Sequence, residues 1–204
     1  SLGLVGSEMC IRDRDYDYIF RCTEMAGKIV HIPRVLYHWR VHSASTADNP
    51  ASKLYAYEAG KKAIEGNLAR CGEEGTVTLR SDYGFYDVDY KLRGTPLVSI
   101  LIPNKDQADT LRTCLESIKK KCMYPSYEIL IIENNSTEEA TFSYYKELEA
   151  QGIRVLKYPK QGFNYSAINN FGVKEAKGEY LLFLNNDMEI ITPDFMEKMV
   201  SNLQ

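Results

Sequence analysis

The chain has 204 residues, of which 25 are basic and 28 acidic, and its formal net charge is -3. This near balance argues against a nucleic-acid binder that neutralises phosphates over a broad surface, while the 44 % of hydrophobic residues can supply a packed core. The five cysteines are odd in number and form no C-x-x-C pair, which argues against a disulfide framework or a zinc ribbon.

No apolar stretch approaches the roughly 20 residues that span a bilayer, so we expect no transmembrane segment. The apolar run at residues 2–5 is too short for a signal peptide and lacks a basic start. We therefore expect a cytoplasmic protein.

The first part of the chain divides into an unpatterned start and a patterned segment. Residues 1–14 have no hydrophobic period and resemble a translated sequencing-adapter tail, so we treat them as non-native. Residues 17–24 have a helical pattern that Gly27 can end. The stretch KIVHIP, residues 28–33, predicts a short strand, and residues 35–42 predict a second extended stretch.

Residues 48–95 are too regularly patterned for a flexible linker, and we expect a structured connector. A helix is predicted over residues 51–70, because its apolar residues share one face and Gly72 follows its end. Two short strands are predicted around the turn at residues 81–84.

After residue 96 the pattern changes to strict alternation of strands and helices. Buried strands are predicted at residues 97–103 and 128–133, and two further strands at residues 153–158 and 179–184. Helices are predicted between them and after residue 193. This succession predicts an α/β fold with a mainly parallel sheet and flanking helices, preceded by a mixed α+β segment.

Polar residues follow the predicted strands of this sheet. The clusters are P-N-K-D at residues 103–106, E-N-N-S at 133–136, G-F-N-Y at 162–165 and N-N-D at 185–187. In an open parallel sheet, ligands bind at the carboxyl ends of the strands. Turn chemistry alone explains one Asn-rich loop better than four of them, so we favour a binding site over a purely structural role.

The side chains in these clusters suit a nucleotide and a cation. Glu133, Asn134 and the loop at Asn104 can take the N–H of a pyrimidine ring and the ribose hydroxyls. Asp187 is an oxygen ligand for Mg²⁺ or Mn²⁺, which would neutralise charge on a leaving diphosphate. The two asparagines before Asp187 can bind the ribose or the sugar.

The sequences PLVSILIPNKDQADTLRTCLESI, YEILIIENNSTE and GFNYSAINNFGVKEAKGEYLLFLNNDMEI are similar to the first half of family 2 glycosyltransferases with the GT-A fold. The resemblance implies that residues 96–204 form the nucleotide-sugar-binding half of such a domain. It implies a divalent metal at Asp187. The implied nucleotide-sugar-binding residues are Pro103, Asn104, Asp106, Glu133, Asn134, Asn164, Asn185 and Asn186.

Two positions depart from the family pattern. Glu133 stands where the family usually has Asp, so its carboxylate reaches one methylene further. The D-x-D motif of the family is Asn185-Asn186-Asp187 here, which leaves a single acid. We therefore expect weaker metal binding than in members with two carboxylates.

Residues 15–47 resemble the end of a family 2 domain, with an acid opening a helix and a Y-x-W-R-x-H stretch closing the fold. The resemblance places Asp15 as the catalytic base of that domain, although an acid at a helix start also serves as a cap. It places His38, Arg40 and His42 near the diphosphate. The two histidines suit packed or solvated positions equally well.

The resemblance implies a tandem enzyme, with the end of one transferase domain at residues 15–47, a connector at 48–95 and the start of a second domain at 96–204. Such an enzyme transfers a sugar from a nucleoside-diphosphate sugar to a saccharide or lipid-linked saccharide acceptor. We expect inversion at the anomeric carbon, a bacterial surface polysaccharide as product, and work in the cytoplasm or at the inner face of the membrane. Neither domain is whole, so we expect no turnover by this fragment.

Other classes fit less well. The first predicted loop has no G-x-G-x-x-G, and the chain has no G-x-x-x-x-G-K-[ST], which disfavours dinucleotide and P-loop sites. A nucleotidyltransferase would carry a Gly- and Arg-rich loop after its first strand, and PNKDQ is neither. A non-catalytic scaffold or nucleotide-binding module stays open as the alternative.

Overall fold

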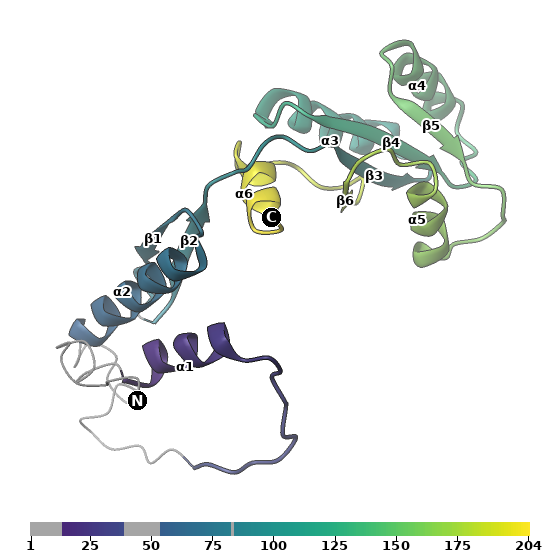
Figure 1. Ribbon diagram of the computed structural model, residues 1–204. Helices are drawn as coiled ribbons and strands as arrows, with labels where there is room; N and C mark the ends of the chain where they lie inside the picture. Colours follow the sequence, from purple (N-terminus) through teal and green to yellow (C-terminus); the bar gives the residue numbers. More distant parts are fainter. Residues whose placement is uncertain (1–13, 39–53, 83) are drawn as a thin grey trace. The chain divides into compact units, whose positions relative to one another are not determined.

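The computed structural model describes residues 14–38, 54–82 and 84–204 (Figure 1). The chain forms two compact units, Ser1–Lys91 and Leu92–Gln204. The boundary lies close to residue 96, where the sequence pattern changes. Each unit has its own hydrophobic core.

The first unit consists of two helices and a β-ribbon. These are α1 (Arg14–Met25), α2 (Leu54–Cys71), β1 (Gly75–Leu79) and β2 (Tyr86–Tyr90). The two strands pair antiparallel, as predicted for the turn at residues 81–84. Ile64 and Leu68 of α2 pack on Val77 of β1, with Phe20 of α1 against them. The carboxylate of Glu24 accepts two bonds from Arg70, at 2.8 Å from each nitrogen, which ties α1 to α2.

The predicted strand at residues 28–33 is wrong. Residues 27–38 form no strand, and the side chains of Ile29, Val30 and Ile32 are 73 %, 68 % and 57 % exposed. An apolar run becomes a strand only where another strand satisfies its backbone groups, and none pairs with it in the described part of the chain. Residues 39–42 of the predicted extended stretch, and residues 1–13, lie outside the described residues.

The second unit is built on a four-stranded parallel sheet. Its strands are β3 (Val98–Asn104), β4 (Tyr127–Glu133), β5 (Arg154–Lys157) and β6 (Tyr180–Phe183). Their order is β5-β4-β3-β6, so β3 and β4 are central. Both central strands are almost entirely buried, as the continuous apolar runs predicted.

Four helices flank this sheet: α3 (Ala108–Lys121), α4 (Glu139–Ala150), α5 (Tyr165–Val173) and α6 (Phe195–Ser201). Alternate residues of β3 face opposite sides, so Ile100 and Ile102 join the core with α3, α4 and α6, while Leu101 packs with α5. Figure 1 shows α5 on the opposite side of the sheet from α3 and α4. The predicted α/β fold with a parallel sheet is confirmed.

The approach of α5 to the sheet depends on Gly172. A Cβ atom there would lie 2.4 Å from Ile132 Cδ1 and 2.6 Å from Leu101 Cδ2. Both neighbours are fully buried, so neither can move away easily. Close packing of this helix positions the loop before it, which carries one of the polar clusters.

None of the helices in the described residues has the length and apolar character needed to cross a bilayer.

Candidate functional site

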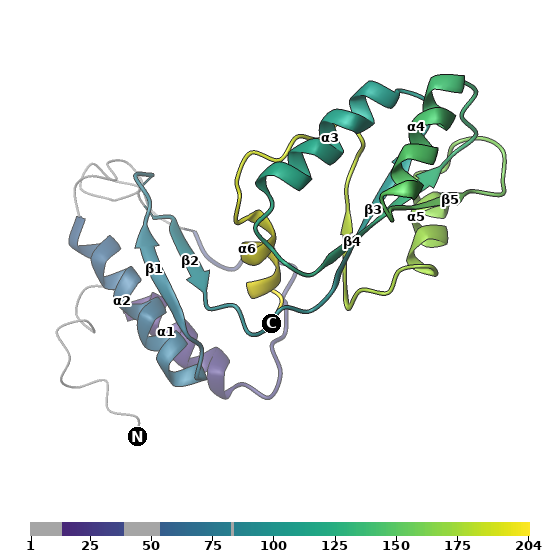
Figure 2. The same cartoon turned by 90° about the horizontal axis from the view of Figure 1, so that it is seen from above.

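β3 pairs parallel with both β4 and β6, so the carboxyl ends of the three strands lie at the same edge of the sheet; Figure 2 shows β3 and β4. Asn104 and Glu133 are register partners at the ends of β3 and β4, and the Asn134 N–H donates to the Asn104 carbonyl at 2.9 Å. Asn186, just past β6, donates from Nδ2 to Asn104 Oδ1 at 2.6 Å. Three of the four predicted polar clusters therefore come together.

The turn after β3 is held to the turn after β4. Pro103 is half-buried within β3, and the Asp106 N–H donates to Ser136 Oγ at 2.9 Å. The Asp106 Oδ1 atom accepts the backbone N–H groups of Thr137 at 2.7 Å and Glu138 at 2.9 Å. These bonds hold the pKa of Asp106 below its usual value. The carboxylate of Asp106, a predicted site residue, is thus already hydrogen-bonded to the backbone just before α4.

Glu133 and Asn134 are both buried at the end of β4, each with 4 % exposure. Glu133 Oε1 accepts the N–H of Ser136 at 2.5 Å, and Asn134 Oδ1 accepts from Asn135 Nδ2 at 3.0 Å. Asn135 has a left-handed backbone, with φ of 59°, which asparagine tolerates well. Its amide also donates to the Lys160 carbonyl at 2.9 Å and so ties the loop after β5 to this edge.

Asn164 lies in that loop, at the start of α5. Its Oδ1 atom accepts the N–H of Ala167 at 3.0 Å and caps the helix. Its side chain is exposed. The side chain of Asn164, a predicted site residue, therefore has a structural role as the N-cap of α5.

The Asn185-Asn186-Asp187 turn follows β6. Asn185 and Asp187 are exposed and Asn186 is half-buried. The thiol of Cys114, on α3, donates to the Asn185 carbonyl at 3.8 Å. Burial, and then the charge of Asp187, raises the pKa of Cys114 to about 11, so this thiol stays neutral beneath the turn.

The oxygen atoms of this turn fit a hard divalent cation that is coordinated mainly by the phosphates of a bound nucleotide. Among the described residues, no group of three or more His, Cys, Asp or Glu side chains could enclose a metal ion. Asp187 is an exposed carboxylate, and the exposed side chain of Asn185 stands two positions before it in the same turn. Mg²⁺ and Mn²⁺ accept one or two protein carboxylates when phosphate oxygens and water complete the shell. This turn therefore suits a cation that arrives with a diphosphate.

The other predicted site residues belong to the first unit. Asp15 lies in the first turn of α1, and its side chain is outside the described residues, as are Arg40 and His42. His38 is exposed.

Sequence reasoning missed Tyr145 of α4. Its hydroxyl accepts a bond from Asn104 Nδ2 at 2.7 Å, and its ring is buried. No motif marks it, because it follows Asn104 by 41 positions and lies in an ordinary amphipathic pattern. Only the packing of α4 brings it to the strand ends.

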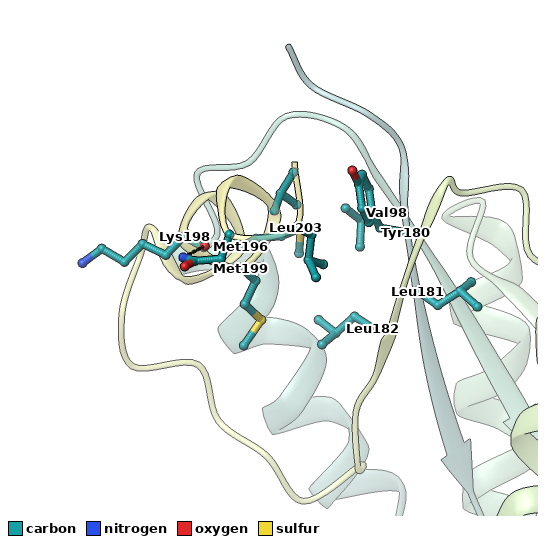
Figure 3. Close-up of a pocket in the computed structure, with 10 residues that line it drawn as sticks. Val98, Tyr180, Leu181, Leu182, Met196, Lys198, Met199 and Leu203 are labelled. Atoms are coloured by element: carbon teal, nitrogen blue, oxygen red, sulfur yellow. Dashed lines mark hydrogen bonds between the residues drawn. The ribbon is translucent and has the colours of Figure 1, made fainter. Parts of the chain in front are cut away.

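An apolar groove of about 480 Å³ lies elsewhere, at the opposite ends of β3 and β6 (Figure 3). It is lined by Val98, Tyr180, Leu181, Leu182, Met196 and Met199, among others. These residues come from the starts of the two strands and from α6. The groove is therefore separate from the polar strand ends.

Comparison with known proteins gives a family match and several relatives. A family model described as Glycosyl transferase family 2 matches residues 99–204. The chain is 41 % identical over 189 residues to the O-antigen biosynthesis protein RfbC of Myxococcus xanthus, covering 93 % of this chain and 15 % of that protein. It is 39 % identical over 196 residues to the uncharacterized protein y4gI of Sinorhizobium fredii, covering 94 % of this chain and 22 % of that protein. The chain thus spans less than a quarter of either relative.

Solved structures give weaker similarity. S. aureus TarS 1-349 gives a TM-score of 0.44 at 19 % identity, covering 51 % of this chain and 31 % of that chain. The mannosyltransferase PcManGT from Pyrobaculum calidifontis, in complex with GDP-Man and Mn2+, gives a TM-score of 0.47 at 15 % identity, covering 74 % and 42 %. Both TM-scores lie below 0.5, so the sequence matches carry the assignment.

Proposed function

Since this chain belongs to glycosyl transferase family 2, we propose that the strand-end edge of its second unit binds the nucleoside diphosphate of a sugar donor. The supporting observation is the convergence of three strand ends, where Asn186 reaches Asn104 at 2.6 Å and Asn104 pairs with Glu133. Polar groups from three separate parts of the chain therefore lie close together at this edge of the sheet. This is the place where open parallel sheets bind nucleotides.

Within this site, each group has a role that its chemistry suits. Glu133 and Asn134 recognise the base and the ribose, since a carboxylate and an amide can accept and donate to those groups. Asn185 and Asp187 face the diphosphate, and Asp187 holds the divalent cation. When bound, that cation neutralises negative charge on the leaving diphosphate.

The reaction moves the sugar from the donor to a saccharide or lipid-linked saccharide acceptor, with inversion at the anomeric carbon. An acid of the complete enzyme takes the proton of the attacking hydroxyl. In the first domain we assign this role to Asp15. The name of the RfbC relative supports a bacterial cell-envelope polysaccharide as the product.

The chain would form part of a tandem enzyme. Alignments with RfbC and y4gI cover 93 % and 94 % of this chain, so each includes both units in the same order. The family model matches the second unit only. We assign the residues from 15 to 47 to the end of a preceding transferase domain and those from 48 to 95 to the connector.

A titration tests the proposed site at Asp187. The ¹⁵N-labelled chain is titrated with UDP or GDP, with and without Mg²⁺, and the affinity is measured from NMR shifts, which detect millimolar binding. We expect Asp187→Asn to remove most of the Mg²⁺-dependent gain in affinity, because it removes the only carboxylate of the turn. The matched control is Glu179→Gln, an exposed acid just before β6 at the other end of the same strand.

Equal affinities of the wild-type chain and Asp187→Asn would reject the metal role of Asp187. The scaffold alternative predicts no metal-dependent affinity for a nucleoside diphosphate in any variant. Shifts confined to the neighbourhood of Glu133 and Asp187 would support the donor site.

A further inference from the structure

The side chain of Asn104 is fully engaged by the protein itself. It is 2 % exposed, and its Nδ2 atom lies 2.9 Å from the Asp106 carbonyl and 2.7 Å from the Tyr145 hydroxyl. Its Oδ1 atom lies 2.6 Å from Asn186 Nδ2. Both amide protons and one oxygen lone pair are therefore used within the protein.

These contacts fix which way the amide points. The Asp106 carbonyl can only accept a hydrogen bond, so the nitrogen of Asn104 must face it. The oxygen of Asn104 then faces Asn186, which must present its own nitrogen. A flipped Asn104 amide would place oxygen against oxygen at the Asp106 carbonyl and nitrogen against nitrogen at Asn186.

Tyr145 anchors the other end of this chain of bonds. It is 4 % exposed on α4, and its ring packs edge-on against Phe142 at 6.2 Å. Its hydroxyl accepts from Asn104 and lies 3.4 Å from Ser136 Oγ. A buried hydroxyl on a packed helix is a fixed point, because the ring cannot turn without displacing its neighbours.

We propose that Tyr145 is a positioning residue that acts through Asn104 and Asn186 to hold the turn presenting Asp187. This inference rests on the proposed donor site at that turn. Asn186 stands directly before Asp187 in the chain, so a fixed Asn186 side chain limits where the Asp187 backbone can lie. Among the described residues, the path runs from α4 through the end of β3 to the turn after β6.

Loss of the Tyr145 hydroxyl would free the Asn104 and Asn186 side chains to move. In Tyr145→Phe the ring and its packing remain, but one buried N–H of Asn104 loses its acceptor. The Asn104 side chain can then rotate towards water, and the acceptor of Asn186 moves with it. The turn then samples positions in which Asp187 is misplaced for the diphosphate.

The test compares Tyr145→Phe with Tyr144→Phe, which removes the same atom from the neighbouring buried tyrosine. The Tyr144 ring lies under Arg112, at 4.1 Å from the guanidinium carbon, and belongs to a different contact. The first measurement is the ¹H–¹⁵N signal of the Asn186 side-chain amide in the ligand-free chain. We expect Tyr145→Phe to shift it and to speed its exchange with solvent, and Tyr144→Phe to leave it unchanged.

The second measurement is the Mg²⁺-dependent affinity for UDP or GDP. We expect about fivefold weaker binding in Tyr145→Phe, which corresponds to about 1 kcal/mol, and wild-type affinity in Tyr144→Phe. In an Asn186→Ala background, Tyr145→Phe should have no further effect, because the group it acts through is absent. A purely structural role would give the same loss in both backgrounds.

Two outcomes separate this inference from the proposed function. If Asp187→Asn weakens binding while Tyr145→Phe matches Tyr144→Phe in both measurements, the positioning role is overturned and the donor site stands. If even the wild-type chain shows no Mg²⁺-dependent affinity for UDP or GDP, the donor site fails and the positioning role fails with it.

Discussion

Asp106 shows how a strand-end carboxylate becomes a structural group. It has a left-handed backbone, with φ of 52°, at the turn after β3. Its carboxylate accepts the N–H groups of Thr137 and Glu138, which precede α4 and have no partner within that helix. A negative charge at the start of a helix also interacts favourably with the helix dipole. Asp106 therefore links β3 to α4, although its sequence position suggested a ligand contact.

The lowered pKa of Asp106 predicts acid sensitivity of the second unit. A carboxyl whose folded pKa lies below its unfolded value of 3.8 stabilises the fold above that value. This contribution is lost as the pH falls through the lowered folded pKa. We expect Asp106→Asn to lower the melting temperature at pH 7. Between pH 5 and pH 2, the melting temperature of this variant should fall less than that of the wild-type chain.

Melting curves of the wild-type chain and Asp106→Asn over this pH range check the prediction. Asp109→Asn is the control, because Asp109 is an exposed acid in the first turn of α3. If the melting temperatures of the wild type and Asp106→Asn fell in parallel with pH, the stabilising role of the Asp106 carboxylate would be contradicted.

At the scale of elements, the opposite end of the sheet is held by a polar cluster around Ser99. The Ser99 hydroxyl is fully buried on β3, donates to Glu128 Oε1 at 2.6 Å and accepts the Gly178 N–H at 2.8 Å. Glu128, on β4, also accepts the Lys177 N–H at 2.7 Å. The cluster joins the two central strands to the turn that leads into β6. Since β6 carries the Asn185–Asp187 turn, this cluster contributes to the geometry of the site.

Ser99→Ala should destabilise the second unit by about 1–3 kcal/mol, because it leaves the Gly178 N–H without its buried acceptor. Urea unfolding with an unchanged m-value would measure this loss. The control is Ser143→Ala, an exposed serine within α4, where alanine has the higher helix propensity. If Ser99→Ala lowered the free energy of unfolding by no more than Ser143→Ala does, the Ser99 cluster would contribute little to stability.

At the scale of the whole molecule, the chain spans a small part of the length of its relatives. It spans 15 % of RfbC and 22 % of y4gI. In the part of the chain that the structure describes, β6 pairs with β3 alone, and the apolar groove beside β6 is open. The proposed donor site lies at the other end of these strands, and β6 is an edge strand among the described residues.

We therefore expect no sugar transfer by the 204-residue chain. An assay with radiolabelled nucleotide sugars and a saccharide acceptor should give only background counts. A longer protein that includes the flanking sequence is the positive control. Turnover by the 204-residue chain alone would refute this expectation.

Much of the second unit could be predicted from local pattern. Continuous apolar runs indicated β3 and β4 as central strands, and the alternation with helices indicated that all four strands run parallel. Parallel strands place their carboxyl ends at one edge, so the meeting of Asn104, Glu133 and Asn186 followed from topology. In the first unit the same approach failed at residues 28–33, because an apolar run contains no information on whether a pairing strand exists.

The sequence by itself determined the order of the strands along the chain, the burial of the central ones and the edge at which the polar residues gather. These properties depend on hydrophobic period and connection rules, which act over short distances along the chain. Only the tertiary structure decided which polar groups are occupied: Asp106 bonds to the start of α4, Asn164 caps α5, and Asn104 is enclosed between Tyr145 and Asn186. Hydrogen bonds of this kind need atoms within about 3 Å of each other, and that proximity depends on how helices pack on the sheet.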